Sequence, residues 1–208
     1  MISIVPHWAA YYDSFWNSIS RRNLWFVKFR YGAVLILILL LISTEFILKL
    51  QLNNLQIRAM MSITAAILFY NIILHIVGKQ CNFQLGKMHT IHFSIIQTHL
   101  DLAALTLLIY YTGSIENPIY MFYVFHMIIG SLILPGALVY ITAGLVIVTV
   151  STIVLGEYMG FIEHHAVAGL LSFPIYNQTN YVLLFLPAFG LMLFFSVAIA
   201  NKIGQTVS

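Results

Sequence analysis

A carboxylate and an imidazole stand inside two long apolar runs of this chain, in positions that hydrocarbon would normally reject. Asp101 belongs to the run that ends at Thr112, and His126 belongs to the run that begins at Ile119. Ionisable side chains within apolar helices are rare, and they commonly mark binding sites or pathways for protons and ions. We therefore take Asp101 and His126 as the first candidates for chemistry.

A short polar link, Gly113 to Pro118, joins the two apolar runs. Asn117 is placed to cap the second helix, Pro118 suits its first turn, and Glu116 would lie beside its positive end. Gly113 permits a backbone conformation that other residues rarely adopt. A well-capped turn explains all of these residues, and a binding role for them stays open beside that interpretation.

The surroundings of Asp101 and His126 fit the head group of a quinone. Counted from the link at about 1.5 Å per residue, His126 lies about 10 Å and Asp101 about 18 Å along its helix. Both could face one cavity that opens toward the outer leaflet, with Gln97 on the same helical face as Asp101 and Tyr120 as an aromatic wall. The alternative for both ionisable residues is a hydrogen bond that fixes helix packing.

Other histidines allow an alternative hypothesis, a haem-binding site. A b-type haem in a helical bundle takes two imidazoles on different helices at similar depth, and His75 and His99 meet that condition. We expect packing or interfacial roles for most histidines, solvated loop positions for His164 and His165, and no bound metal ion apart from that haem alternative.

The composition places the chain in a membrane. Of its 208 residues, 61% are hydrophobic and 7% are charged, and the mean hydropathy is +0.95. So few polar residues could not cover the surface of a water-soluble domain. Since a helix needs about 20 apolar residues to span a bilayer, the chain is predicted to be an all-α, polytopic membrane protein with six transmembrane helices.

The apolar runs divide the chain into three parts. Residues 1–25 hold a cytoplasmic, interfacial amphipathic helix, residues 26–200 form a six-span membrane domain, and residues 201–208 form a cytoplasmic tail. The spans are predicted at 26–48, 57–77, 93–112, 119–134, 137–155 and 181–200, with a polar inner loop at 78–87.

Basic residues predict the orientation. Under this topology most of the nine Lys and Arg lie on one side: Arg21, Arg22, Lys28, Arg30, Lys79, Lys87 and Lys202, against Lys49 and Arg58 on the other. The positive-inside rule then makes both termini cytoplasmic, as in a multi-pass protein of the bacterial inner membrane. The net charge of +3 reports this orientation and does not indicate nucleic-acid binding. No nucleotide-binding loop, zinc motif or nucleophile elbow is present.

The stretch QTHLDLAALTLLIYYTGSIENPIYMFYVFHMII resembles the six-span sensing region of RegB-type, quinone-responsive sensor histidine kinases. In that group a heptapeptide, GGxxNPF, joins spans three and four and contributes to ubiquinone binding. Residues 113–119 correspond to it, with Ser114 in place of the second glycine and Ile119 in place of the phenylalanine.

The resemblance implies a membrane quinone site built from Asn117, Pro118 and Glu116, with Asp101 and His126 as inward partners. The ligand would be ubiquinone or menaquinone. The chain would act as a sensory module that distinguishes the oxidation states of the quinone and signals to a histidine-kinase core.

The segment after the last predicted span, NKIGQTVS, contains no kinase core. Kinase activity would therefore need a cytoplasmic core that follows this segment or acts in trans. The alternative function is a stand-alone, non-catalytic subunit of a membrane respiratory or electron-transfer complex that binds quinone or haem. Either module could form a homodimer.

Overall fold

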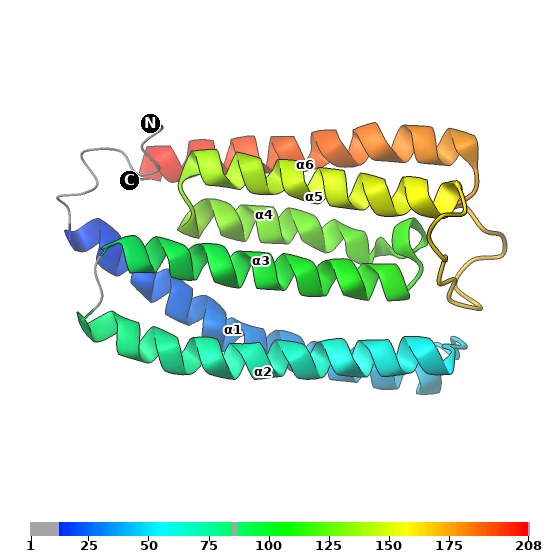
Figure 1. Cartoon of the computed structure of the whole chain (residues 1–208), viewed down its shortest axis with the longest axis horizontal. Helices are drawn as coiled ribbons and strands as arrows, with labels where there is room; N and C mark the ends of the chain where they lie inside the picture. The colour runs from blue at the N-terminus through cyan, green and yellow to red at the C-terminus, as the bar shows by residue number, and fades with distance from the viewer. Residues whose placement is uncertain (1–12, 85–86, 208) are drawn as a thin grey trace.

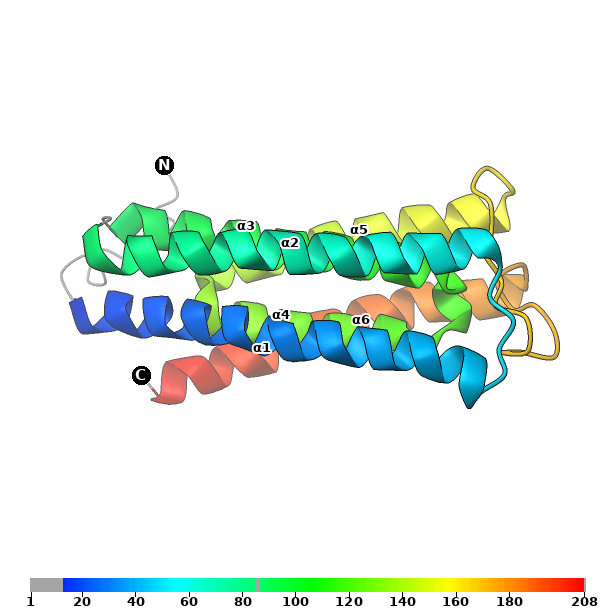
Figure 2. The same cartoon turned by 90° about the horizontal axis from the view of Figure 1, so that it is seen from below.

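The computed structural model describes residues 13–84 and 87–207, and most of them belong to helices. The α-helices are α1 (Asp13–Phe46), α2 (Asn54–Gln84), α3 (Lys87–Tyr111), α4 (Phe122–Ile133), α5 (Gly136–Tyr158) and α6 (Thr179–Val207). Two short 3₁₀ helices, η2 (Ser114–Glu116) and η3 (Pro118–Met121), lie between α3 and α4. The helices run alongside one another in an elongated bundle (Figures 1 and 2).

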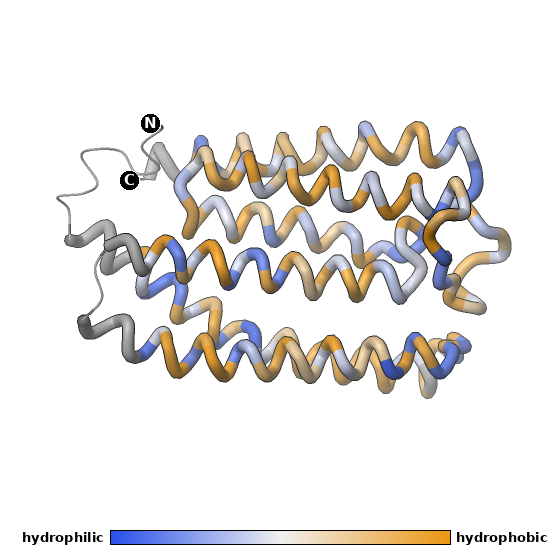
Figure 3. Tube along the Cα trace, in the orientation of Figure 1, coloured by the Kyte–Doolittle hydropathy of each residue, from blue (hydrophilic) through white to orange (hydrophobic). Residues whose placement is uncertain are grey.

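Five of these helices are long and apolar enough to cross a membrane, and the segment Pro118–Ile133 is a shorter apolar helix. Hydrophobic residues continue along every helix, as Figure 3 shows. Large apolar side chains such as Phe69 and Leu184 face outward and are mostly exposed. Such an apolar exterior suits lipid. The predicted all-α fold is confirmed, and the five long apolar helices suggest a multi-pass membrane protein, whereas six spans stay a prediction.

The bundle has two distinct ends, visible in Figure 1. At the end that we call the link end, α3 is joined to α4 through η2 and η3, and residues 159–178 connect α5 to α6. At the other, which we call the basic end, α1 begins and α6 ends. The arginines Arg21 and Arg22 lie near this basic end.

The helices extend beyond the predicted apolar runs. α2 continues to Gln84 and α3 begins at Lys87, so most of the predicted inner loop at 78–87 is helical instead. Hydropathy detects only the apolar part of a helix, whereas polar residues can prolong the same helix into water. From Asp13 onward, the predicted interfacial helix is continuous with α1, and its earlier residues lie outside the described part of the chain.

Two main groups of buried apolar side chains hold the bundle together. The larger joins α3, α4, α5 and α6 around residues such as Tyr123, Met127 and Leu193. The smaller joins α1, α2 and α3 around Val34, Ile63 and others. α4 therefore packs one face, with Tyr123 and Met127, into the bundle although it is the shortest of the six α-helices, and its other face is exposed.

Candidate functional site

The link between α3 and α4 is a capped turn, as its sequence predicts. The Asn117 side chain accepts a hydrogen bond from the backbone N–H of Ile119 at 3.0 Å and donates one to the carbonyl of Thr112 at 3.1 Å. Pro118 begins η3. Gly113 has a φ of 103°, in the left-handed region that favours glycine.

Ser114 also adopts a left-handed backbone, with a φ of 50°. It stands where the heptapeptide described above has its second glycine. Residues other than glycine adopt this conformation at a cost of roughly 1–3 kcal/mol. The link of this chain therefore keeps a backbone suited to two glycines with only one glycine present.

Glu116 is buried beneath the connection between α5 and α6. Its Oε1 accepts hydrogen bonds from the backbone N–H groups of Ile175, at 2.8 Å, and Tyr176, at 3.3 Å. Its Oε2 lies 3.2 Å from Nε2 of His164. The carboxylate thus binds residues 159–178 to the link, in addition to its predicted place near a helix N-terminus.

His164 lies between two carboxylates. While its Nε2 faces Glu116, its Nδ1 lies 3.3 Å from Oε1 of Glu157 at the end of α5. The His164 side chain is 5% exposed and that of Glu157 is fully buried. The His164 ring also stacks on Tyr176, with a 3.8 Å separation of the ring centres. We refer to Glu116, His164 and Glu157 as the Glu–His–Glu cluster.

The cluster favours a protonated imidazole. Burial by itself would lower the pKa of His164, but the interactions with Glu157 and then with Glu116 outweigh it and raise the pKa above the ordinary 6.5. The Glu157 carboxylate has few donors: Oε1 lies 3.3 Å from Nδ1 of His164, and the described residues give neither oxygen a further polar partner. A buried carboxylate with so few donors is costly, so Glu157 can accept further hydrogen bonds from a ligand.

The predicted solvated positions of His164 and His165 are wrong. His165 is buried between the rings of Tyr110 and Tyr111, and its carbonyl accepts a hydrogen bond from Gln56. Both histidines lie in an irregular segment, where no periodicity indicates which side chains turn inward. For His164, the signal that could have indicated burial is the need of two carboxylates, Glu116 and Glu157, for a cation; no comparable signal exists for His165.

Aromatic rings lie next to the link on its membrane side. Tyr120 of η3 meets Phe185 of α6 edge to face, with ring centres 5.0 Å apart. Phe185 stacks on Phe189, whose ring also contacts Tyr123. Tyr120 therefore packs against rings of α6, and its role as an aromatic wall of a quinone site stays a prediction.

Asp101 has a partner that the sequence analysis did not assign. Its Oδ2 lies 2.7 Å from the guanidinium of Arg30 on α1, and its Oδ1 accepts a hydrogen bond from Tyr70 on α2 at 2.7 Å. The Arg30 side chain is 8% exposed. Arg30 was counted among the inner basic residues, yet it lies inside the bundle because an intramembrane carboxylate requires a counter-charge.

Further polar side chains complete this intramembrane network. Arg30 also donates to the side-chain oxygens of Asn71 and Gln97, and Gln97 donates to Asn23 at 2.6 Å. Asn71 donates to the carbonyl of Val27. Gln97 therefore shares the surroundings of Asp101, as predicted, within a network that connects α1, α2 and α3.

The remaining candidate histidines lie apart from both groups. His126 Nδ1 contacts the carbonyl of Phe122 in its own helix, and His99 Nδ1 likewise contacts the carbonyl of Ile95. His75 Nδ1 lies 3.1 Å from the hydroxyl of Tyr31. The structure thus brings Glu116, Asn117, Pro118 and Gly113 together, and it gives Asp101 and His126 different partners from each other.

The fold is α-helical, and its five candidate spans suggest a multi-pass membrane protein. It carries a buried acid–base cluster at one end and a buried ion pair within the bundle. Comparison with protein-family models, with curated proteins and with solved structures finds no match.

Proposed function

We propose that the chain is a quinone-responsive sensory module of the bacterial inner membrane, with its quinone site at the link end. The single observation that carries this proposal is the Glu–His–Glu cluster: a fully buried carboxylate whose one polar neighbour among the described residues is an imidazole, packed against the link. The sequence of that link resembles a quinone-binding heptapeptide. Ubiquinone or menaquinone would supply a ring that interconverts between two carbonyls and two hydroxyls.

The residues of the cluster would bind the oxidised form, the quinone, and the reduced form, the quinol, with unequal affinity. The Glu157 carboxylate would accept a hydrogen bond from a quinol hydroxyl, but it would find no donor on a quinone carbonyl. The His164 imidazolium, whose two N–H groups face Glu116 and Glu157, would keep both carboxylates ionised. Such unequal binding is what a sensor needs, since a ligand shifts a conformational equilibrium only by its differential affinity.

The aromatic residues near the link would hold the ring. Tyr120 and Phe185, which contact each other edge to face, would border a planar ring, and the lipid-facing sides of α4 and α6 would accommodate an isoprenoid tail. We assign Asp101 and Gln97 a different role, because Arg30 and Tyr70 already engage the Asp101 carboxylate. They would fix the packing of α1, α2 and α3.

The proposed topology has six spans and cytoplasmic termini. The segment Pro118–Ile133 would be about 26 Å long, a few ångströms short of a typical hydrocarbon core. Thinning of the bilayer can accommodate such a mismatch. The basic residues near the start of α1 favour a cytoplasmic location for that end, from which α6 would signal to a kinase core.

Quinone content tests this proposal. We expect near-stoichiometric quinone in solvent extracts of the detergent-purified protein, and its loss from an Asn117→Ala variant, which breaks the cap of the link. Asn53→Ala is the matched control, because Asn53 caps α2 at the same end through Gln56. Equal trace amounts in all three proteins would refute a quinone site at the link.

A further inference from the structure

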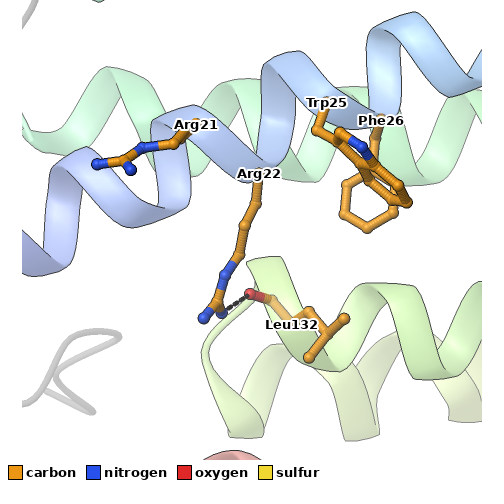
Figure 4. Close-up of a pocket in the computed structure, with 5 residues that line it drawn as sticks. All are labelled: Arg21, Arg22, Trp25, Phe26 and Leu132. Atoms are coloured by element: carbon orange, nitrogen blue, oxygen red, sulfur yellow. Dashed lines mark hydrogen bonds between the residues drawn. The ribbon is translucent and has the colours of Figure 1, made fainter.

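A surface pocket of about 400 Å³ opens between α1 and α4 at the basic end. Its lining residues are Arg21, Arg22, Trp25, Phe26 and Leu132. Figure 4 shows Arg22 reaching from α1 to the end of α4, with the rings of Trp25 and Phe26 on the same helix. The pocket therefore combines two cations with apolar walls.

The charge of the pocket is uncompensated by its own residues. Arg22 donates one hydrogen bond, at 2.8 Å, to the carbonyl of Leu132. A guanidinium carries five N–H donors, so most of those of Arg22 remain available to a ligand. The lining residues include no carboxylate. Planar guanidinium groups match the oxygens of a phosphate especially well.

An apolar track leads away from the arginines along α1. Trp25 and Phe29 are both more than half exposed, and their rings stack with centres 5.4 Å apart. One turn further, Gly32 has open space where a Cβ would project, and Ile36 is again exposed. The spacing of these four residues places them on one face of the helix.

We propose that this pocket binds an anionic phospholipid from the leaflet at the basic end. Its phosphate would lie against Arg21 and Arg22, and an acyl chain would follow Trp25, Phe29 and Ile36. Basic pockets between membrane helices are a recognised means of binding anionic head groups, and tryptophan favours the level of those head groups. The site is independent of the quinone proposal, because it lies at the opposite end of the bundle.

Quenching of Trp25 fluorescence tests the lipid site directly. The chain has three tryptophans, so Trp8→Phe and Trp16→Phe make Trp25 the only reporter. The protein is reconstituted in phosphatidylcholine vesicles that contain either brominated phosphatidylglycerol or brominated phosphatidylcholine. We expect the anionic quencher to act at a mole fraction several-fold lower than the zwitterionic one.

Two variants distinguish a specific lipid-binding site from general electrostatic attraction between anionic lipids and the basic residues of α1. Arg21→Gln breaks no hydrogen bond of the described residues, and it should reduce the preference for the anionic lipid by roughly five-fold. Lys28→Gln is the matched control, since it removes a cation from α1 outside the pocket; the preference should then change little. An equal loss in both variants, or no loss with Arg21→Gln, would overturn the proposal.

Soluble phosphate distinguishes a lipid site from a general oxyanion site. The same titration is repeated with inorganic phosphate at constant ionic strength. We expect the preference for the anionic lipid to persist, because the acyl chain contributes to binding. Its abolition by phosphate would overturn the assignment of a lipid.

Discussion

His164 contacts more of the link end than any other side chain of the Glu–His–Glu cluster, and its surroundings raise its pKa. Its imidazolium would interact with Glu157 on one side and Glu116 on the other, and its ring stacks on Tyr176. Through these contacts one side chain joins η2, the end of α5 and the segment before α6. Its charge state should therefore affect the stability of the whole link end.

The stability of the protein should fall as pH rises through the pKa of His164. The folded state raises this pKa above the ordinary 6.5, so the folded protein binds the proton more tightly than the unfolded chain does. The resulting stabilisation is complete below pH 6.5 and is lost above the raised pKa. Unfolding midpoints in detergent across this range measure the effect.

His164→Gln provides the comparison for that titration. This variant cannot bind the proton, so its stability should lack the decline that the parent shows over the same pH range. A parent protein whose midpoint is constant, or rises, over this range would contradict an imidazolium held between two carboxylates.

Inside the bundle, Arg30 and Asp101 form a buried ion pair. Asp101→Asn would leave the buried guanidinium without its counter-charge and should destabilise the protein by about 3–5 kcal/mol. The double variant Arg30→Gln/Asp101→Asn removes both charges and should lose less than the sum of the single variants. Reversible unfolding in mixed micelles measures the three free energies; strictly additive losses would mean that the two charges do not interact in the folded protein.

At the scale of elements, α5 positions Glu157 one residue after a crowded glycine. A Cβ at Gly156 would lie 2.5 Å from Cδ1 and 2.7 Å from Cγ1 of Ile162. The carbonyl of Gly156 also accepts hydrogen bonds from the backbone of Phe161 and Ile162. The chain thus turns tightly over the end of α5, and this turn places the His164 side chain next to Glu157.

Gly156→Ala should therefore destabilise the protein by about 1–3 kcal/mol, because Ile162 must move. Gly144, in the same helix, has no atom within 4 Å of its Cβ position. Gly144→Ala should be neutral or stabilising by up to about 1 kcal/mol. Thermal unfolding of both variants compares them, and similar effects at the two glycines would disprove the close packing over α5.

The positions of the helices in the sequence were easier to predict than the side-chain contacts between them. The six apolar helices follow from hydropathy, and the Pro135–Gly136 turn separates α4 from α5 as expected. The rotation of each helix about its axis depends on packing against its neighbours, so the sequence could not show that Asp101 faces Arg30. Likewise, no periodicity in residues 159–178 indicated that His164 turns toward Glu116.

At the scale of the whole molecule, the polar groups lie in three regions along the bundle. The Glu–His–Glu cluster lies at the link end, the Arg30–Asp101 network lies within α1, α2 and α3, and the two pocket arginines lie at the basic end. A sensor of this construction would bind its ligand at one end and transmit the change through α5 and α6, which both connect to the cluster.

The most direct test of this account is the relative affinity of the protein for quinol and quinone. Unfolding midpoints are measured with matched concentrations of the reduced and oxidised forms of a short-chain quinone, since tighter binding to the folded state raises the midpoint more. We expect the quinol to bind at least about ten-fold more tightly, because Glu157 can accept a hydrogen bond only from its hydroxyls. Glu157→Gln should reduce this difference. Equal midpoint shifts with the two forms, or no shift with either, would contradict the account.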